Sequence, residues 1–219
     1  MTATIYCIDM WLCDYMEENK ITGLKAQKNK NRVNVFINNE FAFGLERDVA
    51  AWLRIGQIVS NEKIKELKEN DTIEVAYRKA VNFIAYRQRT EFEVKNKLKT
   101  LGYGEEVICN VSSRLKTAGL IDDVRFAELW IESRCNSKPR GYRLLDMELK
   151  RKGIEEGIIK KTMNNVEDEI TLAKKAVEKK LWKFKNLNNE DKKKKLIAHL
   201  TYRGFSYGSI RTVIDEMIK

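Results

Sequence analysis

The sequence is poor in the residues and patterns that most enzymes and membrane proteins need. A single histidine, His199, excludes a His-rich metal site, and no Gly-rich phosphate loop occurs in the 219 residues. No apolar run approaches the roughly 20 residues that span a bilayer. The four cysteines have neither a pairing rhythm nor a CxxC spacing. We therefore expect a cytoplasmic chain with reduced thiols and with no catalytic residues, cofactor or metal, and not a membrane protein.

Charge is what the sequence has in excess. Lys and Arg number 42 against 32 Asp and Glu, which gives a net charge of +10, while 43% of the residues are hydrophobic. This composition predicts a globular protein with a heavily charged surface. A positive balance favours a polyanionic partner, nucleic acid before an anionic membrane. An ordinary solvated helical surface explains the same charge equally well.

The first residues form a segment apart from the rest. Residues 1–15 are fairly apolar, carry Asp9 and lack an early basic residue, so they make a poor secretory signal. We interpret them as an extension of uncertain role. A second hypothesis is that translation starts at Met16, which immediately precedes a charged stretch.

Residues 16–70 predict a small α+β unit. The Asn38-Asn39 pair tolerates positive φ and suits a hairpin turn between two alternating strands. The sequence predicts strands over 21–26, 32–37 and 41–43, a helix over 46–55, and a second helix, capped by Ser60, over 60–67. This unit could serve as a docking adaptor or as a simple structural cap for the helical region after residue 70.

Beyond residue 70 a single pattern occurs three times. Gly102, Gly153 and Gly204 are separated by 51 residues each, and five apolar columns keep the same register. The columns are Val94, Leu145, Leu196; Leu98, Leu149, Leu200; Tyr103, Ile154, Phe205; Ile108, Ile159, Ile210; and Leu115, Val166, Met217.

Each copy predicts a module of three short helices. Two apolar positions four residues apart define a middle helix, and the glycine ends it by turning the chain through positive φ. Thr90 and Glu93 form the pattern of a capping box at the start of the first middle helix. The first helices are expected over 76–88, 124–136 and 172–184, and the modules over 71–122, 123–170 and 171–219. The fold class is therefore mainly α, with three tandem helix-turn-helix-like repeats after a small hairpin-containing unit.

The charge pattern argues against the usual use of such modules, which is major-groove reading by the third helix. Two of the third helices begin with acid, Glu105-Glu106 and Glu155-Glu156, and these carboxylates would repel DNA. Basic residues follow the middle helices and the breaks before them instead. The candidate binding residues are Arg87, Arg89, Lys95, Lys99, Lys138, Arg140, Arg143, Lys150, Arg151, Lys192, Lys193, Lys194 and Arg203. For any one of them a solvated surface charge is an alternative role.

The segment Gly119-Leu120-Ile121-Asp122-Asp123, continued by Phe126, Trp130, Gly141, Leu149 and Gly153, resembles the signature of the RecX family. RecX proteins are bacterial regulators of the RecA recombinase, and the resemblance covers nearly the whole chain from about residue 20. It implies three tandem modules and control of RecA filaments on single-stranded DNA, most often by inhibition, within DNA repair, recombination and the SOS response. Separately, we expect the protein to act as a monomer, since the sequence has no evident dimerisation element.

Three points stay open on the sequence alone. Asp122 and Asp123 are either filament contacts or caps of the helix that begins there. Trp130 and Trp182 are either core residues or platforms on which nucleobases stack, and we expect the core because each lies within an apolar helical stripe. A stand-alone helix-turn-helix DNA-binding protein is the alternative function, and it predicts a sequence-specific duplex site.

Overall fold

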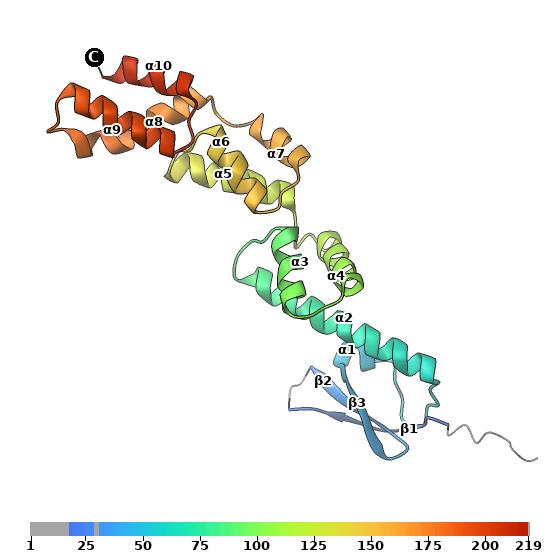
Figure 1. The fold of residues 1–219 in the computed structure, drawn as a ribbon. Helices are drawn as coiled ribbons and strands as arrows, with labels where there is room; N and C mark the ends of the chain where they lie inside the picture. The colour runs from blue at the N-terminus through green and yellow to red at the C-terminus, as the bar shows by residue number, and fades with distance from the viewer. Residues whose placement is uncertain (1–17, 29–30, 219) are drawn as a thin grey trace, which may run out of the picture. The chain divides into compact units, whose positions relative to one another are not determined.

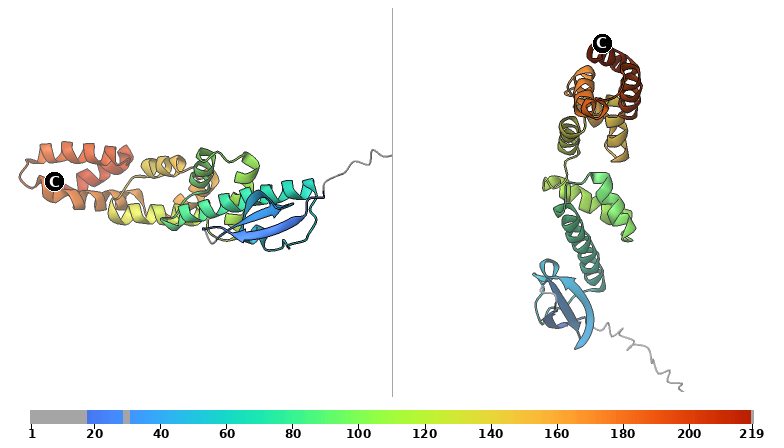
Figure 2. Two further views of the ribbon diagram at one scale, coloured as in Figure 1. Left: turned by 90° about the horizontal axis from the view of Figure 1, so that it is seen from below. Right: turned by 90° about the vertical axis from the view of Figure 1, so that its left-hand side faces the viewer.

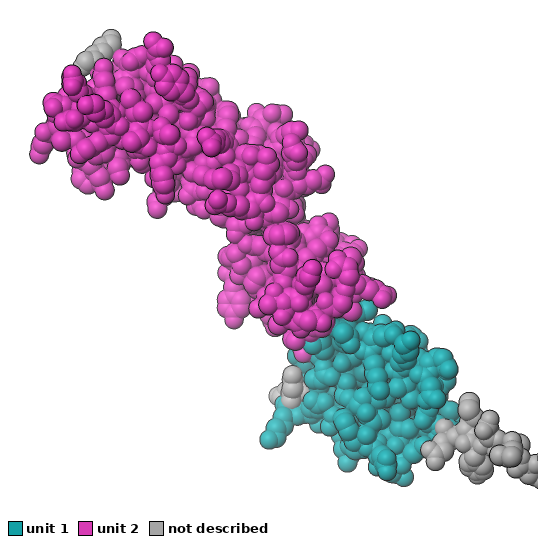
Figure 3. Space-filling model, viewed as in Figure 1, with its two compact units in different colours: residues 1–75 teal, residues 76–219 magenta. Residues whose placement is uncertain are grey.

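The computed structural model describes residues 18–28 and 31–218, which form two compact units that divide between residues 75 and 76 (Figure 3). Residues 1–15 and Met16, for which an extension and an alternative start were predicted, lie outside the described residues. The first unit holds a small sheet, and the second is helical (Figure 1). The predicted class, mainly helical with a β-containing unit at the N-terminal side, is confirmed.

The sheet of the first unit has three antiparallel strands in the order β1-β2-β3, formed by Ile21–Ala26, Arg32–Ile37 and Glu40–Glu46. Asn38 and Asn39 both have positive φ, 51° and 67°, and turn the chain between β2 and β3 as predicted. Val35 and Leu45, from one face of the sheet, are fully buried against Leu67 of α2 (Asn61–Ala85) and their neighbours.

Two helix predictions for this unit are wrong. The helix expected over 46–55 is a single turn, α1 (Arg47–Ala50), because residues 56–59 return to pair with the edge of the sheet. Ile21 donates its N–H to the Gln57 carbonyl at 2.8 Å, and Gly56 turns at φ +92°. The helix expected to end at 67 continues to Ala85 as α2, since residues 68–75 contain neither glycine nor proline to end it. Ser60 accepts the Lys63 N–H, as a cap should.

The second unit contains the three predicted modules, called repeats 1 to 3. Each has a first, a middle and a third helix, and the modules are arranged in sequence order along the unit (Figures 1 and 2). Repeat 1 comprises the second half of α2, α3 (Glu91–Thr100) and α4 (Glu105–Thr117); repeat 2 comprises α5 (Asp123–Ser137), α6 (Tyr142–Arg151) and α7 (Glu156–Met163); repeat 3 comprises α8 (Glu169–Leu181), the 3-10 turn η1 (Trp182–Phe184), α9 (Asn189–Tyr202) and α10 (Tyr207–Met217).

The apolar columns form the cores of the three repeats. Val94, Leu145 and Leu196 are each 0% exposed, and the next column along the middle helices is equally buried. The three column glycines have φ of +83°, +74° and +79°, so each ends its middle helix in the left-handed region. The 51-residue period therefore corresponds to one structural module, as predicted.

The two tryptophans expected in the core behave differently. Trp130 packs on Phe126, with ring centroids 5.7 Å apart, at the edge of the repeat 2 core. Trp182 is 62% exposed, so its prediction is wrong. The helical stripe on which that prediction rested ends at Leu181, and η1 turns the Trp182 ring away from the core.

Candidate interaction surface

Consecutive middle helices meet end to end. The N-terminus of α3 lies against the C-terminal turn of α6, where the Thr90 hydroxyl donates to the Lys152 carbonyl at 2.7 Å. The N-terminus of α6 lies against the turn of α9 in the same way, with the Gly141 N–H donating to the Arg203 carbonyl at 3.0 Å. Thr90 and Gly141 are 51 residues apart, as are Lys152 and Arg203. We call these contacts the 1–2 joint and the 2–3 joint. Each places a helix N-terminus on a helix C-terminus, which is a favourable alignment of dipoles.

The column glycines also make room for the joints. A Cβ on Gly204 would lie 2.8 Å from the backbone nitrogen of Leu144, and a Cβ on Gly153 would overlap the ring of Phe92. A Cβ on Gly102, which has no preceding module, would meet nothing within 4 Å. Glycine is thus required at Gly153 and Gly204 for two reasons, the left-handed turn and the close approach of the middle helix of the preceding repeat.

An acidic residue at the start of each following repeat completes each joint. Asp123 accepts the backbone N–H of Glu91 at 2.9 Å, and Glu169 accepts that of Tyr142 at 3.2 Å. Glu91 and Tyr142 are again 51 residues apart. Burial raises the pKa of Asp123, and this outweighs the opposing hydrogen bond from the Glu91 N–H. Asp122 accepts the Arg125 N–H at 2.9 Å and so caps α5. The structure therefore gives both aspartates an internal contact.

Carboxylates at the start of α3 collect several cations. Burial alone would raise the pKa of Glu91, but hydrogen bonds from Lys116, Lys95 and Ser112 outweigh it and lower the pKa to about 2. The Glu93 carboxylate forms ion pairs with the Arg87 guanidinium at 3.0 Å and with the Lys152 ammonium at 2.6 Å. The predicted capping box is only half formed. Thr90 accepts the Glu93 N–H, but the Glu93 carboxylate binds these cations.

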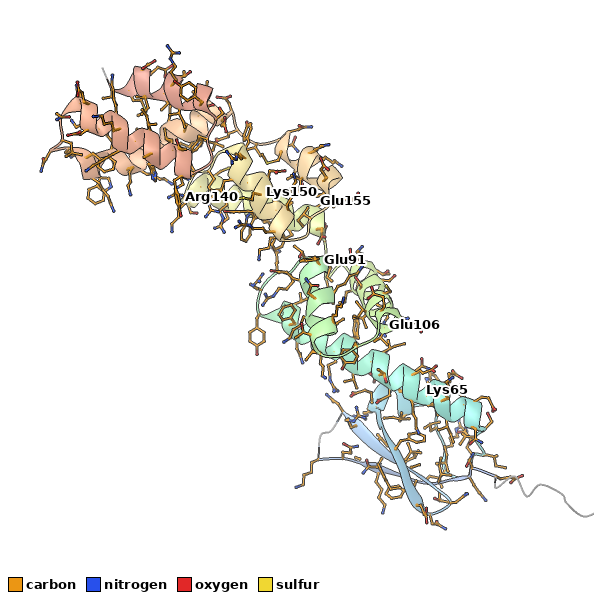
Figure 4. The ribbon with its side chains drawn as sticks, in the orientation of Figure 1. Lys65, Glu91, Glu106, Arg140, Lys150 and Glu155 are labelled. Carbon is orange, nitrogen blue, oxygen red and sulfur yellow. The ribbon has the colours of Figure 1, made fainter. Side chains whose placement is uncertain are left out.

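Glu148, on α6, has the same role in repeat 2. It accepts the Trp130 indole N–H at 3.0 Å and the Arg134 guanidinium at 3.2 Å, and it forms an ion pair with Arg140. The Glu148 side chain is 16% exposed and that of Arg140 is 18% exposed. Arg140 precedes α6, at the opposite end of that helix from Lys150 (Figure 4). Arg140 therefore belongs to a half-buried network that holds α5 and α6 together.

Many of the candidate basic residues are neutralised by such contacts. Arg87 and Arg140 are paired as described, Lys95 pairs with Glu91 at 2.9 Å, and Lys150 pairs with Asp146 at 3.0 Å. The Arg89 guanidinium lies 3.9 Å over the Phe83 ring. In the part of the chain that the structure describes, no ion pair involves Lys99, Lys138, Arg143, Arg151, Lys192, Lys193, Lys194 or Arg203. These residues are the remaining candidates for an external anion.

The third helices do not present a basic end. Glu105 and Glu106 at the start of α4, and Glu155 and Glu156 at the start of α7, are all exposed (Figure 4). Negative side chains complement the N-terminal dipole of a helix, which explains their position. They would also oppose phosphates at the end that a groove-reading helix inserts. The acidic starts of α4 and α7 therefore do not suit helices that read bases in a DNA groove.

Sequence reasoning missed several residues of repeat 3. Lys179, Lys180 and His199 lie beside Lys138 and Arg203 in one small groove. The exposed Trp182 follows Lys180 by two residues, at the start of η1. One signal was present in the sequence: Lys192, Lys195, His199 and Arg203 have the spacing of a single helix face. Among residues 18–28 and 31–218, no group of three or more acidic, His or Cys side chains could hold a metal ion. No helix in those ranges is long and apolar enough to cross a membrane.

This architecture defines a class: tandem three-helix modules preceded in the sequence by a small β unit. Four family models match it in order along the chain. They are the regulatory protein RecX N-terminal domain at residues 19–60 and the first, second and third three-helix domains of RecX at 76–115, 122–163 and 167–214.

Individual relatives agree. Regulatory protein RecX of Clostridium tetani is 35% identical over 207 residues, which cover 91% of this chain and 95% of the relative. The protein of the same name from Bacillus licheniformis is 31% identical, with 90% and 76% covered. A crystal structure of a regulatory protein RecX superposes with a TM-score of 0.74 at 26% identity, covering 90% of this chain and 99% of that one. The chain therefore belongs to the RecX family of regulatory proteins.

Proposed function

We propose that this protein binds the filament that RecA forms on single-stranded DNA and lowers its recombinase and ATPase activity. Membership of a family of regulatory proteins supports a regulatory role, and the resemblance of the sequence to RecX implies RecA as the target. The action proposed is that of a monomer in the cytoplasm, within DNA repair and recombination.

One observation carries the proposal: the 1–2 and 2–3 joints use equivalent residues. Because equivalent contacts connect each repeat to the next, the modules recur in an equivalent arrangement along the helical unit. A filament is a polymer of identical subunits, so it offers equivalent sites at regular intervals. Several weak module contacts made together can give tight binding, since each one after the first is intramolecular.

The direct test uses RecA from the same organism. DNA-dependent ATP hydrolysis and strand exchange are measured while the protein is raised to the concentration of RecA, and co-sedimentation with filaments on single-stranded DNA reports binding. We expect co-sedimentation and a dose-dependent fall in both activities. Unchanged activities at equal concentration, together with no co-sedimentation, would rule the proposal out.

The ion pairs decide which basic residues suit a surface test. Arg140 is unsuitable for charge reversal, because it is paired with Glu148 inside repeat 2. Arg143 and Arg151 are exposed on α6, and reversing both to Glu changes the charge by four units with little effect on folding. The matched control is the same change at Lys160 and Lys161 on α7. We expect the α6 variant to bind the filament more weakly than the original protein does, and the α7 control to bind it as the original does.

The alternative, a helix-turn-helix protein that acts alone on duplex DNA, makes a different prediction. It requires tight binding to a particular duplex sequence and no dependence on RecA. A selection from random duplexes that enriches no sequence would count against it. The exposed acid at the starts of α4 and α7 leads us to expect that result.

A further inference from the structure

One face of α9 is entirely basic. Lys192, Lys195, His199 and Arg203 occur at i, i+3, i+7 and i+11, so they lie along one side of the helix over about 16 Å. The nearest acidic residues on this helix, Glu190 and Asp191, lie in its first turn, where they complement the helix dipole. Within the described ranges neither of these two acids forms an ion pair with the four residues. We call these four residues the α9 stripe.

A groove of about 100 Å³ runs beside the C-terminal half of the stripe, where α5 ends and α8 passes α9. Its lining includes Lys138, Lys179, Lys180, His199 and Arg203, and it includes no carboxylate. Lys179 donates to the Asn136 and Ser137 carbonyls, and Arg203 donates to the Lys138 carbonyl at 3.4 Å. These carbonyls fix the two cations in place and leave their charge unneutralised. The groove is therefore a fixed concentration of positive charge.

The electrostatics of His199 reflect this surplus. Burial lowers the pKa of His199, and the positive charges of Arg203 and Lys180 lower it further. No carboxylate contributes to this shift. An anion in the groove would offset the repulsion among these groups and favour proton uptake by His199.

Two exposed aromatic residues belong to the elements that carry the groove and the stripe. Trp182 is 62% exposed, and the Lys183 ammonium lies 5.1 Å from its ring centroid. Trp182 follows Lys180 of the groove by two residues, and the Lys195 ammonium of the stripe lies 5.8 Å from the ring of Phe184, which belongs to the same η1 turn as Trp182. Tyr202, next to Arg203 at the C-terminal end of the stripe, is 82% exposed. Exposed rings beside a cationic track are the usual means of binding a single strand, since bases stack on the rings and phosphates follow the cations.

We propose that the α8–α9 groove and the α9 stripe of repeat 3 form a binding site for single-stranded nucleic acid, with Trp182 as its base-stacking platform. A stacked strand carries one phosphate about every 3.4 Å, so the stripe spans four or five of them. A duplex keeps its base faces covered and cannot use the Trp182 ring. The site deepens the proposed function, because it assigns the contact with the strand to repeat 3. It is nevertheless testable without RecA.

The experiment measures binding of a fluorescein-labelled 15-nucleotide oligo(dT) to the full chain by fluorescence anisotropy, without RecA, over a series of salt concentrations. The groove variant replaces Lys180 and Lys195 with Gln. The control variant makes the same two changes at Lys160 and Lys161 on α7, outside the site. We expect the groove variant to bind about tenfold more weakly at low salt. Its log–log salt slope should fall by about 1.4, because two phosphate contacts are lost at about 0.7 each. The control should stay within about twofold.

A third variant separates stacking from charge. Trp182→Ala should weaken binding about fivefold or more while leaving the salt slope unchanged, since it removes a base–ring contact and no ion. If the oligonucleotide quenches tryptophan fluorescence in the original protein, the share of that quenching that comes from Trp182 should be absent in this variant. Thermal unfolding midpoints within about 2 °C of the original show that every variant is folded.

The proposal would be overturned by equal losses of oligo(dT) affinity in the groove and control variants. It would also be overturned if Trp182→Ala kept the full oligo(dT) affinity of the original, or if a 15-base-pair duplex bound equally tightly. If the groove variant loses oligonucleotide binding but still inhibits RecA, the groove is supported as the nucleic-acid site and the RecA contact lies elsewhere. Inhibition of RecA by a protein that binds no oligo(dT) would defeat the groove alone and leave the proposed function standing.

Discussion

The same face of the middle helix has opposite character in repeats 2 and 3. On α9 it carries Lys192, Lys195, His199 and Arg203, and the equivalent residues on α6 are Gly141, Leu144, Glu148 and Lys152. Gly141 and Leu144 contact the turn of α9, and Glu148 binds arginines of its own repeat. Lys152 binds Glu93 across the 1–2 joint. On α6, internal contacts therefore occupy the whole face.

The difference arises from position in the array. Lys192 and Lys195 occupy the places that form a joint in repeats 1 and 2, and no further module comes after α9 among the described residues. Asn188 caps the helix instead, accepting the Asp191 N–H at 2.7 Å. A helix face that makes no contact with another module can carry charges without internal partners, and on α9 these charges are positive.

The largest effect is expected at the 2–3 joint. Gly204→Ala forces an L-residue into the left-handed region and drives its Cβ against the Leu144 backbone. We expect a loss of about 3 kcal/mol in the free energy of unfolding, the sum of the backbone and overpacking costs. Gly102→Ala has the same φ but open space around its Cβ, so about 1 kcal/mol is expected. Urea denaturation followed by circular dichroism measures both. Equal losses would mean that the joint contributes nothing.

In repeat 1 the start of the middle helix also carries a carboxylate with internal partners, that of Glu91. The pKa of Glu91 is lowered to about 2, so its charged form stabilises the fold at neutral pH. This contribution is fully present above the unfolded pKa near 4.5 and is lost as the pH falls through 2. We expect Glu91→Gln to be about 2 to 3 kcal/mol less stable at pH 7. The difference should shrink steadily between pH 4.5 and 2 in urea denaturation. A difference that does not vary with pH would contradict the charge-based role.

Glu148→Gln tests the carboxylate that α9 lacks. The change leaves Arg134 and Arg140 half-buried without their counter-charge, and we expect a loss of about 2 kcal/mol. The control is Glu156→Gln, which removes an exposed ion pair with Lys160 and should leave the stability almost unchanged, because solvent screens that pair. Both values come from denaturant unfolding. If the two variants lose equal stability, the Glu148 network is no more than a surface ion pair.

The parts of this structure that sequence could predict are those with local causes. The apolar columns and the Gly102, Gly153 and Gly204 turns depend on helix spacing and on positive φ, and both are visible in a single module. The end of α1 was mispredicted because residues 56–59 pair with a strand distant in sequence. Helical spacing alone could not place Trp182, since the helix ends one residue before it.

Charge was harder to interpret than shape. Arg140 and Lys192 are both basic residues near the start of a middle helix, and nothing local distinguishes them. Their difference comes from Glu148, which folding brings to Arg140, and from the lack of a further module at Lys192 among the residues that the structure describes. Contacts within a module and between modules therefore decide which candidate residues stay free to bind a partner.

The smallest effect tests the comparison most directly, because His199 occupies the position of Glu148. His199→Glu places a carboxylate between Lys180 and Arg203, which turns the α9 face into a copy of the α6 face. We expect oligo(dT) to bind about tenfold more weakly at low salt, about 1.4 kcal/mol, in anisotropy measurements, with no loss of stability.

His199→Gln is the matched control, and it also tests the pH dependence. At pH 7.5 the histidine is neutral, because its pKa is lowered, so this variant should bind as the original does. As the pH falls from 7 to 5.5, phosphates in the groove favour protonated His199, and affinity should rise more in the original protein than in His199→Gln. The stability contributed by His199 runs the other way: it is fully present above about pH 6.5 and is lost as the pH falls through the lowered value. If His199→Glu bound oligo(dT) as tightly as the original, the unpaired charge of α9 would be an ordinary solvated surface, and the contrast with α6 would have no bearing on DNA.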